Sequence, residues 1–485
     1  MAKPTQPRPP RADDPAPGPG ASERHRRRWP ISVFLVFTMV ASITVAAGSA
    51  YGIFLYDRAE GATPPIPAPT DPAHRDDADA VVREDTGPCA KGVCNYMILG
   101  SDSRKGLSPG EQSQFGSEIT QPGRRSDTIM VVHVDPAEEH ATVLSFPRDL
   151  WVKIPHQGYG RITSAYEAGE YRVANVIHRL TGLQINGFLT VNLAGFEGVV
   201  RALGSVPICI ASPLVDPTGF SGLDLRHAGC YELDPQQALA FVRARHICDE
   251  GGFPDFNRIA RQQQFLRVVL ARTMSAGAVF HAKAIIDEVL PNIRRSPSLD
   301  VADMYYLVDK LRGLTTGAVD FRAVPTQPTT AGAAQVLELR PEARQLFERL
   351  RTGKPLGDLG KEQLLTPPSP AAVRVRVLDQ GSGGAARKVS EYLLHSGFDI
   401  QPLGTAPASL VQAGPGIYYA PGADHAADVV RKFLPPLHLQ PAPSGTVGEV
   451  DVAVVIDSAY NGPGVVTPTP EPSPTGEGAS TPTCP

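Results

Sequence analysis

The chain has 485 residues, of which 42% are hydrophobic, and its formal net charge is −4. A chain of this length and apolar content can bury a large core, and it predicts two folded domains joined by linkers. Residues 1–30 carry a net charge of +4, so the remainder sums to −8, which excludes a globally basic nucleic-acid-binding region beyond residue 30.

An uncharged run, residues 31–56, follows a basic cluster at 24–28 in a Pro-rich tail, residues 1–30, that is predicted to be disordered. At about 1.5 Å per residue, a helix of this length crosses a hydrocarbon core of about 30 Å. Because basic residues before a first span stay in the cytoplasm, the sequence predicts a single-pass protein of the cell membrane whose bulk is extracytoplasmic. A cleaved signal peptide is the alternative, since residues 46–50 are small, but its apolar core would span only about 7 to 15 residues.

All six cysteines lie beyond this run, where an oxidising compartment favours disulfides over free thiols. Cys89 and Cys94 are close enough in sequence to form a clip at the start of the folded region. Cys209 and Cys230 flank a turn-rich segment that would bring them together as a hairpin does. The pairing of the other two cysteines stays open. Zinc is discounted, because the spacings lack a paired Cys-x2-Cys or His-x3-His pattern.

Residues 57–88 are rich in Pro, Ala and Asp without apolar periodicity, which predicts a disordered linker. A larger domain over residues 89–354 begins with a buried strand at 94–100. Two further strands, at 128–134 and 141–146, are joined by a short turn of suitable composition.

Helical and strand patterns alternate along the rest of this domain. Asp234 and Pro235 suit a helix cap and a first helical position, so they predict a helix that runs through Arg243. The other predicted elements are helices at 164–180, 191–203, 256–274, 280–290 and 300–312, and strands at 183–190 and ending at Val324. This order predicts an α/β fold, with a mixed central sheet packed by helices.

A second, smaller α/β domain is predicted over residues 373–460, after a Pro- and Gly-rich linker at residues 355–372. Its predicted elements are a strand at 373–378, a helix at 385–396 and a strand at 451–456. Residues 461–485 are rich in Thr, Pro and Ser, which predicts a disordered tail.

Charged residues stand at three strand ends of the predicted sheet, where α/β folds bind ligands. They lie in residues 100–104, 124–128 and 146–149. Asp102 and Asp127 are candidates for a shared Mg²⁺, an ion that favours one or two carboxylates plus phosphate oxygens. Each Asp taken singly could instead cap a turn.

A second set of polar residues lies on the helix predicted at 256–274. Arg258, Arg261 and Gln262 stand three and four positions apart and are expected to share one face. Five arginines lie between positions 243 and 267, in a region that is net acidic. Because arginine binds phosphate in a bidentate manner, this density favours a phosphate site over a solvated basic face. His133 is expected to be a packing residue. No phosphate loop, zinc-protease or serine-hydrolase motif is present.

These residues resemble the LytR-CpsA-Psr (LCP) family of bacterial envelope enzymes. The resemblance spans about residues 95–265 and rests on seven segments in one order: Leu99–Arg104, Arg125–Met130, Phe146–Leu150, Leu180–Gly182, Val191–Phe196, Leu233–Arg245 and Asp255–Gln264. Residues 373–458 resemble the LytR C-terminal domain. Thr163 and Asn257 depart from the usual Asn and Gly of the family.

The resemblance implies transfer of a glycopolymer from a polyprenyl-pyrophosphate carrier to peptidoglycan, with Mg²⁺ on the pyrophosphate and the prenyl chain in an apolar tunnel between sheet and helices. Such phosphoryl transfer needs positioning and charge neutralisation rather than an activated nucleophile. A pyrophosphatase that acts on the same lipids and a non-enzymatic envelope-binding scaffold are the alternatives. Nucleic acid is not expected as a partner.

The resemblance also assigns roles to residues. Asp102 and Asp127 are expected to hold Mg²⁺. The residues expected to bind pyrophosphate are Arg104, Arg125, Arg148, Arg243, Arg245, Arg258 and Gln262. Those expected to act in catalysis are Arg148, Asp149, Arg245 and Asp255. Whether Asp149 or Asp255 holds an arginine or accepts the proton of the acceptor is left open.

Overall fold

The computed structural model describes residues 57–63, 65–81, 89, 92–103, 126–138, 140–218, 220–248, 254–273, 289–300, 302–304, 306, 319–361, 370, 373–443, 445–448 and 450–460. The run at 31–56 and both predicted terminal tails lie outside these residues. Most of the helix predicted at 280–290 also lies outside them. Within the described segments, no helix has the length and apolar character needed to span a membrane.

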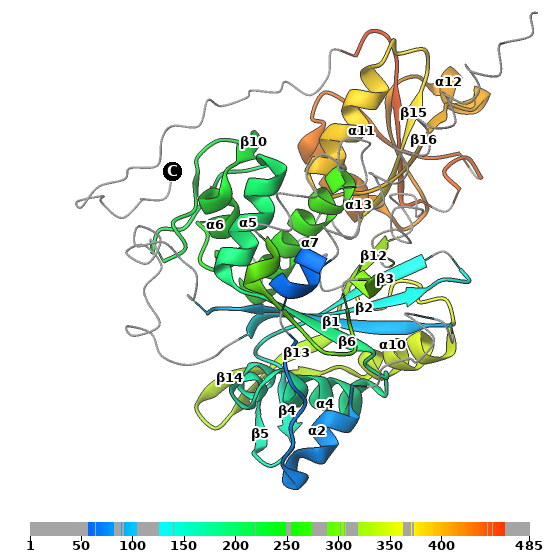
Figure 1. Cartoon of the computed structure of the whole chain (residues 1–485). Coiled ribbons are helices and arrows are strands. Elements are labelled where there is room, and N and C mark those ends of the chain that lie inside the picture. Colours follow the sequence, from blue (N-terminus) through cyan, green and yellow to red (C-terminus); the bar gives the residue numbers. More distant parts are fainter. Residues whose placement is uncertain are drawn as a thin grey trace, which may run out of the picture. The chain divides into compact units, whose positions relative to one another are not determined.

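A six-stranded mixed sheet forms the centre of the larger domain. Its order is β11 (Ile293–Arg295), β6 (Gly187–Val191), β1 (Cys94–Ser101), β2 (Ser126–Asp135), β3 (His140–Phe146) and β12 (Val319–Ala323). Figure 1 shows its strands β1, β2, β3, β6 and β12 side by side. β1 pairs with β2 antiparallel and with β6 parallel, and β3 pairs with β12 parallel. The strands predicted at 94–100, 128–134 and 141–146 are confirmed. Their near-continuous apolar runs reflect a sheet that is buried on both faces.

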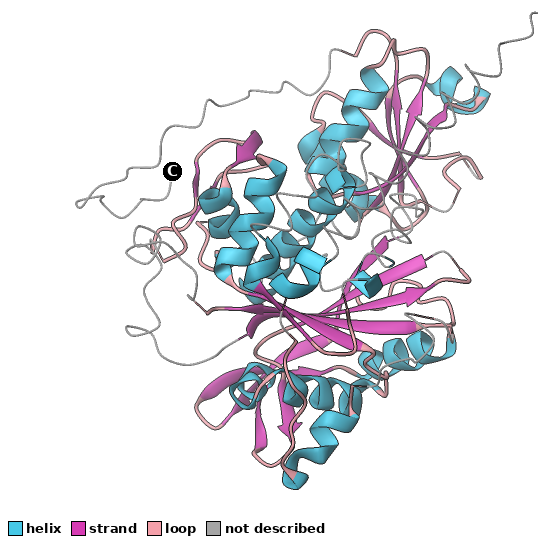
Figure 2. Cartoon of the chain, in the orientation of Figure 1, coloured by secondary structure: helices cyan, strands magenta, loops and turns pink. Residues whose placement is uncertain are grey.

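Helices cover both faces of this sheet (Figure 2). On one face, side chains of β1 to β3 pack with α4 (Glu170–Thr181) and α10 (Pro341–Thr352). On the other face, Leu266 and Leu270 of α7 (Pro254–Thr273) pack on Val143 and Phe321. The helices α5 (Leu193–Leu203) and α6 (Pro235–Arg243) share a second core with α7. The arrangement places α5, α6 and α7 over the sheet edge at which the predicted site residues stand.

Short strand pairs complete this domain. They are β4 (Trp151–Ile154) with β5 (Gly158–Arg161), β7 (Val206–Ile210) with β10 (Gly229–Leu233), β8 (Leu214–Val215) with β9 (Asp224–Leu225), and β13 (Thr326–Ala331) with β14 (Ala334–Leu339). The strands β13 and β14 and the helix α10 were not predicted from the sequence.

The helix predicted at 164–180 is divided in two. A 3-10 helix, η2 (Ile162–Ala168), ends at Gly169, and α4 begins at Glu170. Gly169 has a φ of 103°, which a residue with a side chain rarely adopts, so the chain changes direction there. The start of α6 is as predicted, because the Asp234 side chain accepts a hydrogen bond from the backbone N–H of Gln237.

Residues 65–81 are folded, in contrast to the disordered linker predicted over 57–88. They contain η1 (Pro72–His74) and α2 (Arg75–Asp79). Pro65 forms a β-bridge with Arg295, and the buried carboxylate of Asp77 accepts hydrogen bonds from Arg172 of α4. The prediction rested on missing apolar periodicity, but this segment is held by backbone and charged contacts together with single apolar residues, such as Ile66 and Val81, that pack into the central core.

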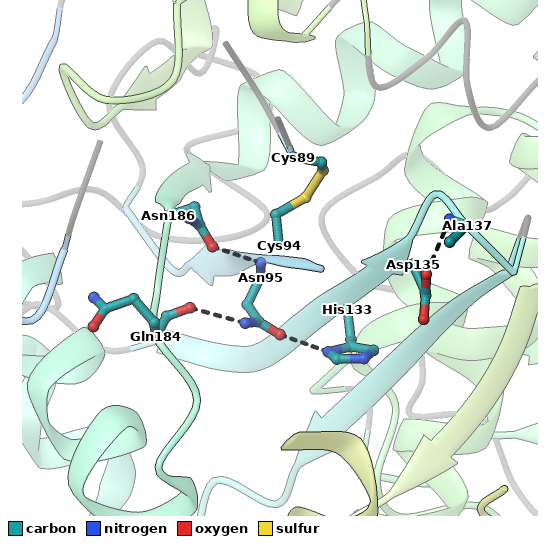
Figure 3. The surroundings of a disulfide bond; sticks show 8 residues. All are labelled: Cys89, Cys94, Asn95, His133, Asp135, Ala137, Gln184 and Asn186. Carbon is teal, nitrogen blue, oxygen red and sulfur yellow. Dashed lines mark hydrogen bonds between the residues drawn. A yellow bond between two sulfur atoms is a disulfide. The ribbon is translucent and has the colours of Figure 1, made fainter. Parts of the chain in front are cut away.

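Two disulfides lie at the positions predicted from spacing. Cys209 stands opposite Cys230 in the β7–β10 pair. Cys89 pairs with Cys94 at the start of β1. Next to this disulfide lies a series of hydrogen-bonded polar groups around Asn95, shown in Figure 3. There the amide of Asn95 contacts Nδ1 of His133 at 2.7 Å. Burial lowers the pKa of His133 to about 4, so the ring is neutral at pH 7 and serves packing, as predicted.

The smaller C-terminal domain has a five-stranded sheet. Its order is β16 (Asp399–Thr405), β15 (Arg374–Asp379), β19 (Val452–Ile456), β17 (Gly416–Tyr419) and β18 (Leu439–Pro441), and its helices are α11 (Ala385–His395), α12 (Ala408–Ala413) and α13 (Asp424–Phe433). The three elements predicted here are confirmed. Residues 355–361 of the predicted linker lie against β12, since Arg322 donates hydrogen bonds to the carbonyls of Gly357 and Leu359.

Candidate active site

A cavity of about 340 Å³ lies between the central sheet and the helices α5, α6 and α7. Most of its wall is apolar, with side chains such as Met130, Phe196 and Leu266. The polar residues of its wall are Ser101, Asp102, Asp127, Thr128, Asn192, Arg243, Arg258 and Gln262. Ser101 and Asp102 end β1 beside the start of β2. The cavity therefore offers an apolar interior together with a charged region at the sheet edge.

Arg148 is the centre of a cluster of ion pairs at this edge. Its Nη1 donates to Oδ1 of Asp127 at 2.7 Å. Its Nε lies 3.6 Å from Asp149 and 3.9 Å from Asp255. Asp255 in turn contacts Nη2 of Arg258 at 2.5 Å. The loop after β3 and the first turn of α7 thus bring together residues that are about a hundred positions apart in sequence.

The carboxylates of this cluster have opposite pKa shifts. Burial acts to raise the pKa of Asp127, but the guanidinium groups of Arg258, Arg148 and Arg243 outweigh it, so the pKa is lowered. Burial also raises the pKa of Asp255, and there the nearby Arg258 and Arg148 do not compensate. Asp127 is therefore held as an anion, whereas the charged form of Asp255 is disfavoured by its surroundings.

The hydrogen bonding of this cluster is incomplete. Within the described part of the chain, Nε of Arg148 and Nε of Arg258 have no hydrogen-bond partner, and the Asp255 carboxylate makes its ion pair with Arg258 but no hydrogen bond. Arg258 is only 2% exposed. Buried polar atoms are normally paired, so a cluster that leaves several of them without hydrogen bonds is arranged to receive another polar group. Guanidinium groups in this setting suit an oxyanion.

The helix α7 contributes to the site in two ways. Arg258 and Gln262, four residues apart, both line the cavity as predicted. Arg261 does not share that role, which corrects the predicted common face of three residues. Its guanidinium donates to the backbone carbonyls of Phe241 and Ala244, at 3.2 and 2.5 Å. Arg261 thus fixes the end of α6, the helix that carries Arg243.

One of the predicted arginines that the structure describes, Arg245, is not brought into this cluster. Arg104 and Arg125 lie outside the described residues. Arg245 follows α6 in a loop and does not line the cavity. Among the described arginines, Arg243 and Arg258 line the cavity, and Arg148 adjoins it through its ion pair with Asp127.

Asp149 and Asp255 both hold arginines, but they differ in exposure. The Asp255 side chain is 4% exposed and lies beneath Arg148 and Arg258. The Asp149 side chain is 23% exposed, and its Oδ1 lies 3.0 Å from Nε of Arg161. Arg161 was not among the predicted site residues, although it begins the Arg161–Thr163 segment that resembles a family motif. The β4–β5 pair sets Arg161 opposite Trp151, close to Asp149.

Asp102 and Asp127 are the two carboxylates on the cavity wall. Within the described ranges, no group of three or more His, Cys, Asp or Glu side chains could hold a metal ion. Two carboxylates beside an anion site are a donor set that fits Mg²⁺, which takes few protein ligands and completes its shell with water and phosphate oxygens.

Two family models match the chain. Residues 70–352 match the LytR_cpsA_psr family. Residues 372–460 match the LytR cell envelope-related transcriptional attenuator model.

Relatives with names related to the cell wall are similar to the chain. Probable cell wall biosynthesis protein LcpB of Corynebacterium glutamicum is 34% identical over 188 residues, which is 39% of this chain and 44% of that protein. Polyisoprenyl-teichoic acid–peptidoglycan teichoic acid transferase TagU of Oceanobacillus iheyensis is 26% identical over 289 residues, or 57% of this chain and 80% of that protein. The match thus spans less than half of the first relative and most of the second.

A solved structure is also similar. The LytR-Csp2A-Psr enzyme from Actinomyces oris is 22% identical, with a TM-score of 0.44. The similarity covers 56% of this chain and 94% of that one.

Proposed function

Because the chain belongs to the LytR-CpsA-Psr family, whose model matches residues 70–352, we propose that it transfers a glycopolymer from a polyprenyl-pyrophosphate carrier to peptidoglycan. Relatives such as TagU carry the name of a transferase that joins a polyisoprenyl-linked polymer to peptidoglycan. The observation that carries the proposal for this chain is an apolar cavity whose wall includes Arg243 and Arg258, with Arg148 adjoining it through Asp127.

The two parts of the cavity match the two parts of such a lipid. The apolar wall, with Met130, Phe196 and Leu266, suits a prenyl chain. Arg148, Arg243 and Arg258 suit the pyrophosphate, and each charge-assisted contact contributes about 1.5 to 3 kcal/mol. Neither part alone would select this ligand, since a free phosphate leaves the apolar wall empty and a fatty acid carries too little charge.

The reaction balances without a covalent protein intermediate. A hydroxyl oxygen of the acceptor forms a bond to the phosphorus that bears the glycan, and the bridging P–O bond breaks. Polyprenyl phosphate leaves with the electron pair. The arginines neutralise the charge on the phosphate oxygens as it shifts to the leaving group. We assign the acceptor's proton to Asp149, because its carboxylate is more exposed than that of Asp255.

Mg²⁺ and the membrane anchor are part of the same proposal. Asp102 and Asp127 would hold Mg²⁺, which when bound supplies further positive charge to the pyrophosphate. The uncharged run at 31–56 would keep the domain at the outer surface of the cell membrane, where a lipid-linked substrate is met.

Product analysis tests the proposed transfer. The full-length protein, in bilayers, is given a glycan-bearing polyprenyl pyrophosphate with and without peptidoglycan. We expect glycan phosphate attached to peptidoglycan, and release of polyprenyl phosphate only when the acceptor is present. Equal release without peptidoglycan would mean that water is the acceptor and that the protein is a pyrophosphatase. An absence of both products would leave a binding scaffold as the explanation and overturn the transfer.

A further inference from the structure

Phe220 is an exposed aromatic residue beside the charged region of the cavity. It is 61% exposed, and Tyr159 is the other strongly exposed aromatic residue in the described ranges. The guanidinium carbon of Arg243 lies 5.9 Å from the centre of the Phe220 ring. Arg243 lines the cavity together with Arg258 and Gln262. A ligand phosphate held by Arg243 would therefore place its next group within reach of this ring.

The turn that carries Phe220 is fixed by a buried carboxylate. Asp216, 1% exposed, accepts hydrogen bonds from the backbone N–H groups of Thr218 and Ser221, both at 3.0 Å. Its oxygens also accept from the hydroxyl groups of the same two residues. Burial raises the pKa of Asp216, but these hydrogen bonds outweigh it and the pKa is lowered. The backbone is thus tied down on both sides of Phe220.

The surroundings of Phe220 favour a single flat partner over a membrane. Val215 of β8, Leu225 of β9 and Leu223 just before β9 are at most 3% exposed, and Leu214 of β8 is partly buried. Membrane-surface contact normally needs a continuous apolar patch, and among the described residues 211–229 Phe220 is the strongly exposed large apolar side chain. A pyranose ring offers a face of C–H groups, which pack on the electron-rich face of an aromatic ring.

We propose that Phe220 is a stacking platform for the sugar ring that is attached to the pyrophosphate of the donor lipid. This inference rests on the proposed function and deepens it. The cavity would take the prenyl chain, the arginines would hold the pyrophosphate, and Phe220 would bind the first sugar. Phe220 would then contribute to selectivity for the first sugar of the glycan, whereas the cavity and the arginines contact only the prenyl chain and the pyrophosphate.

Binding of two lipids by the full-length protein separates these contributions. One probe is polyprenyl pyrophosphate, and the other is the same lipid bearing one N-acetylhexosamine on the pyrophosphate. For Phe220→Ala we expect binding of the sugar-bearing lipid to weaken about tenfold, while binding of the sugar-free lipid stays unchanged. Phe220→Tyr keeps an aromatic face and should retain affinity within about twofold. Tyr159 on β5 is 67% exposed, so Tyr159→Ala is the matched control and should bind both lipids as the unmodified protein does.

Two outcomes would overturn the platform. Equal weakening for both lipids would show that Phe220 acts on the prenyl chain or the pyrophosphate. Unchanged binding of both lipids by Phe220→Ala would show that the ring contacts no sugar. A failure of the unmodified protein to bind either lipid would overturn the proposed function itself, so the two failures are distinguishable.

Discussion

Two clusters of arginine and aspartate lie in the same domain, one buried and one partly exposed, and they differ in their hydrogen bonding. In the first cluster, Arg172 of α4 donates from Nε to both oxygens of Asp77, at 2.9 and 2.7 Å. Its Nη1 donates to the carbonyl of Pro155 and its Nη2 to His74, at 2.6 and 3.0 Å. Asn175 completes the shell of Asp77 at 2.7 Å. This cluster, which holds the segment at 65–81, is complete.

The second cluster, around Arg148 at the cavity, is incomplete. Its charges are as close as those of the first, but the guanidinium donors Nε of Arg148 and Nε of Arg258 lack a hydrogen-bond partner in the described ranges. Each such atom costs about 1 to 3 kcal/mol when buried. Ion pairs alone therefore do not identify a binding site. In a structural cluster every polar atom has a hydrogen-bond partner within the protein, whereas a binding cluster has donor atoms that only a ligand can pair.

Removing Arg148 should have the largest effect on function. Arg148→Ala deletes a guanidinium next to the position proposed for the pyrophosphate, so we expect kcat/KM for transfer to fall by a factor of about 10³ or more. Thermal unfolding should change little, because the cluster is not complete without its ligand. The measurements are transfer kinetics and thermal unfolding. Unchanged transfer by the purified variant would remove this residue from the site.

Arg172→Ala is the matched substitution in the complete cluster. It leaves the carboxylate of Asp77 buried without its cation, so the free energy of unfolding should fall by about 3 to 5 kcal/mol. Transfer per folded molecule should stay within about twofold at low temperature. Denaturant unfolding and transfer kinetics measure the two quantities. The comparison fails if Arg172→Ala loses transfer while it keeps its stability.

Metal dependence gives an intermediate effect. If Asp102 and Asp127 hold Mg²⁺, a concentration one hundred times the dissociation constant should stabilise the folded protein by about 2.7 kcal/mol. The double variant Asp102→Asn, Asp127→Asn should show no such stabilisation. Calorimetric unfolding with and without Mg²⁺ measures this difference. An equal response of both proteins would place the metal elsewhere.

Asp255 should show the smallest effect on stability, with a defined pH dependence. Because its pKa is raised in the folded state, its contribution to stability is fully present below the unfolded carboxyl pKa and is lost as pH rises through the folded pKa. Asp255→Asn should therefore be more stable than the unmodified protein at pH 7, and this gain should shrink as the pH is lowered. Unfolding measured from pH 7 to pH 3 tests the sign. A loss of stability at pH 7 would contradict it.

The sequence predicted the sheet and the helices where a pattern is local. The apolar runs of β1, β2 and β3 and the cap at Asp234 depend on neighbouring residues, and they are confirmed. The folded segment at 65–81 was missed because its partners, such as Arg172, lie about a hundred positions away. The same limit applies to the division of the helix at Gly169, which depends on one backbone angle.

The candidate site shows the same division between local and distant information. The motifs identified Asp127, Arg148, Asp255 and Arg258, which the structure brings together. Helical spacing does not predict that Arg261 donates a hydrogen bond to the backbone of α6, because that contact depends on how α6 packs on α7. The completeness of a hydrogen-bonding shell is likewise invisible in sequence, since it is a property of atoms in three dimensions.

Identifying the lipid that co-purifies with the full-length protein tests the central claim most directly. Mass spectrometry of the extracted ligand should show a polyprenyl pyrophosphate that bears a glycan. The Arg172→Ala protein should retain this lipid and the Arg148→Ala protein should lose it. Recovery of phospholipid alone, or equal retention by both variants, would contradict the account that the incomplete cluster is the pyrophosphate site.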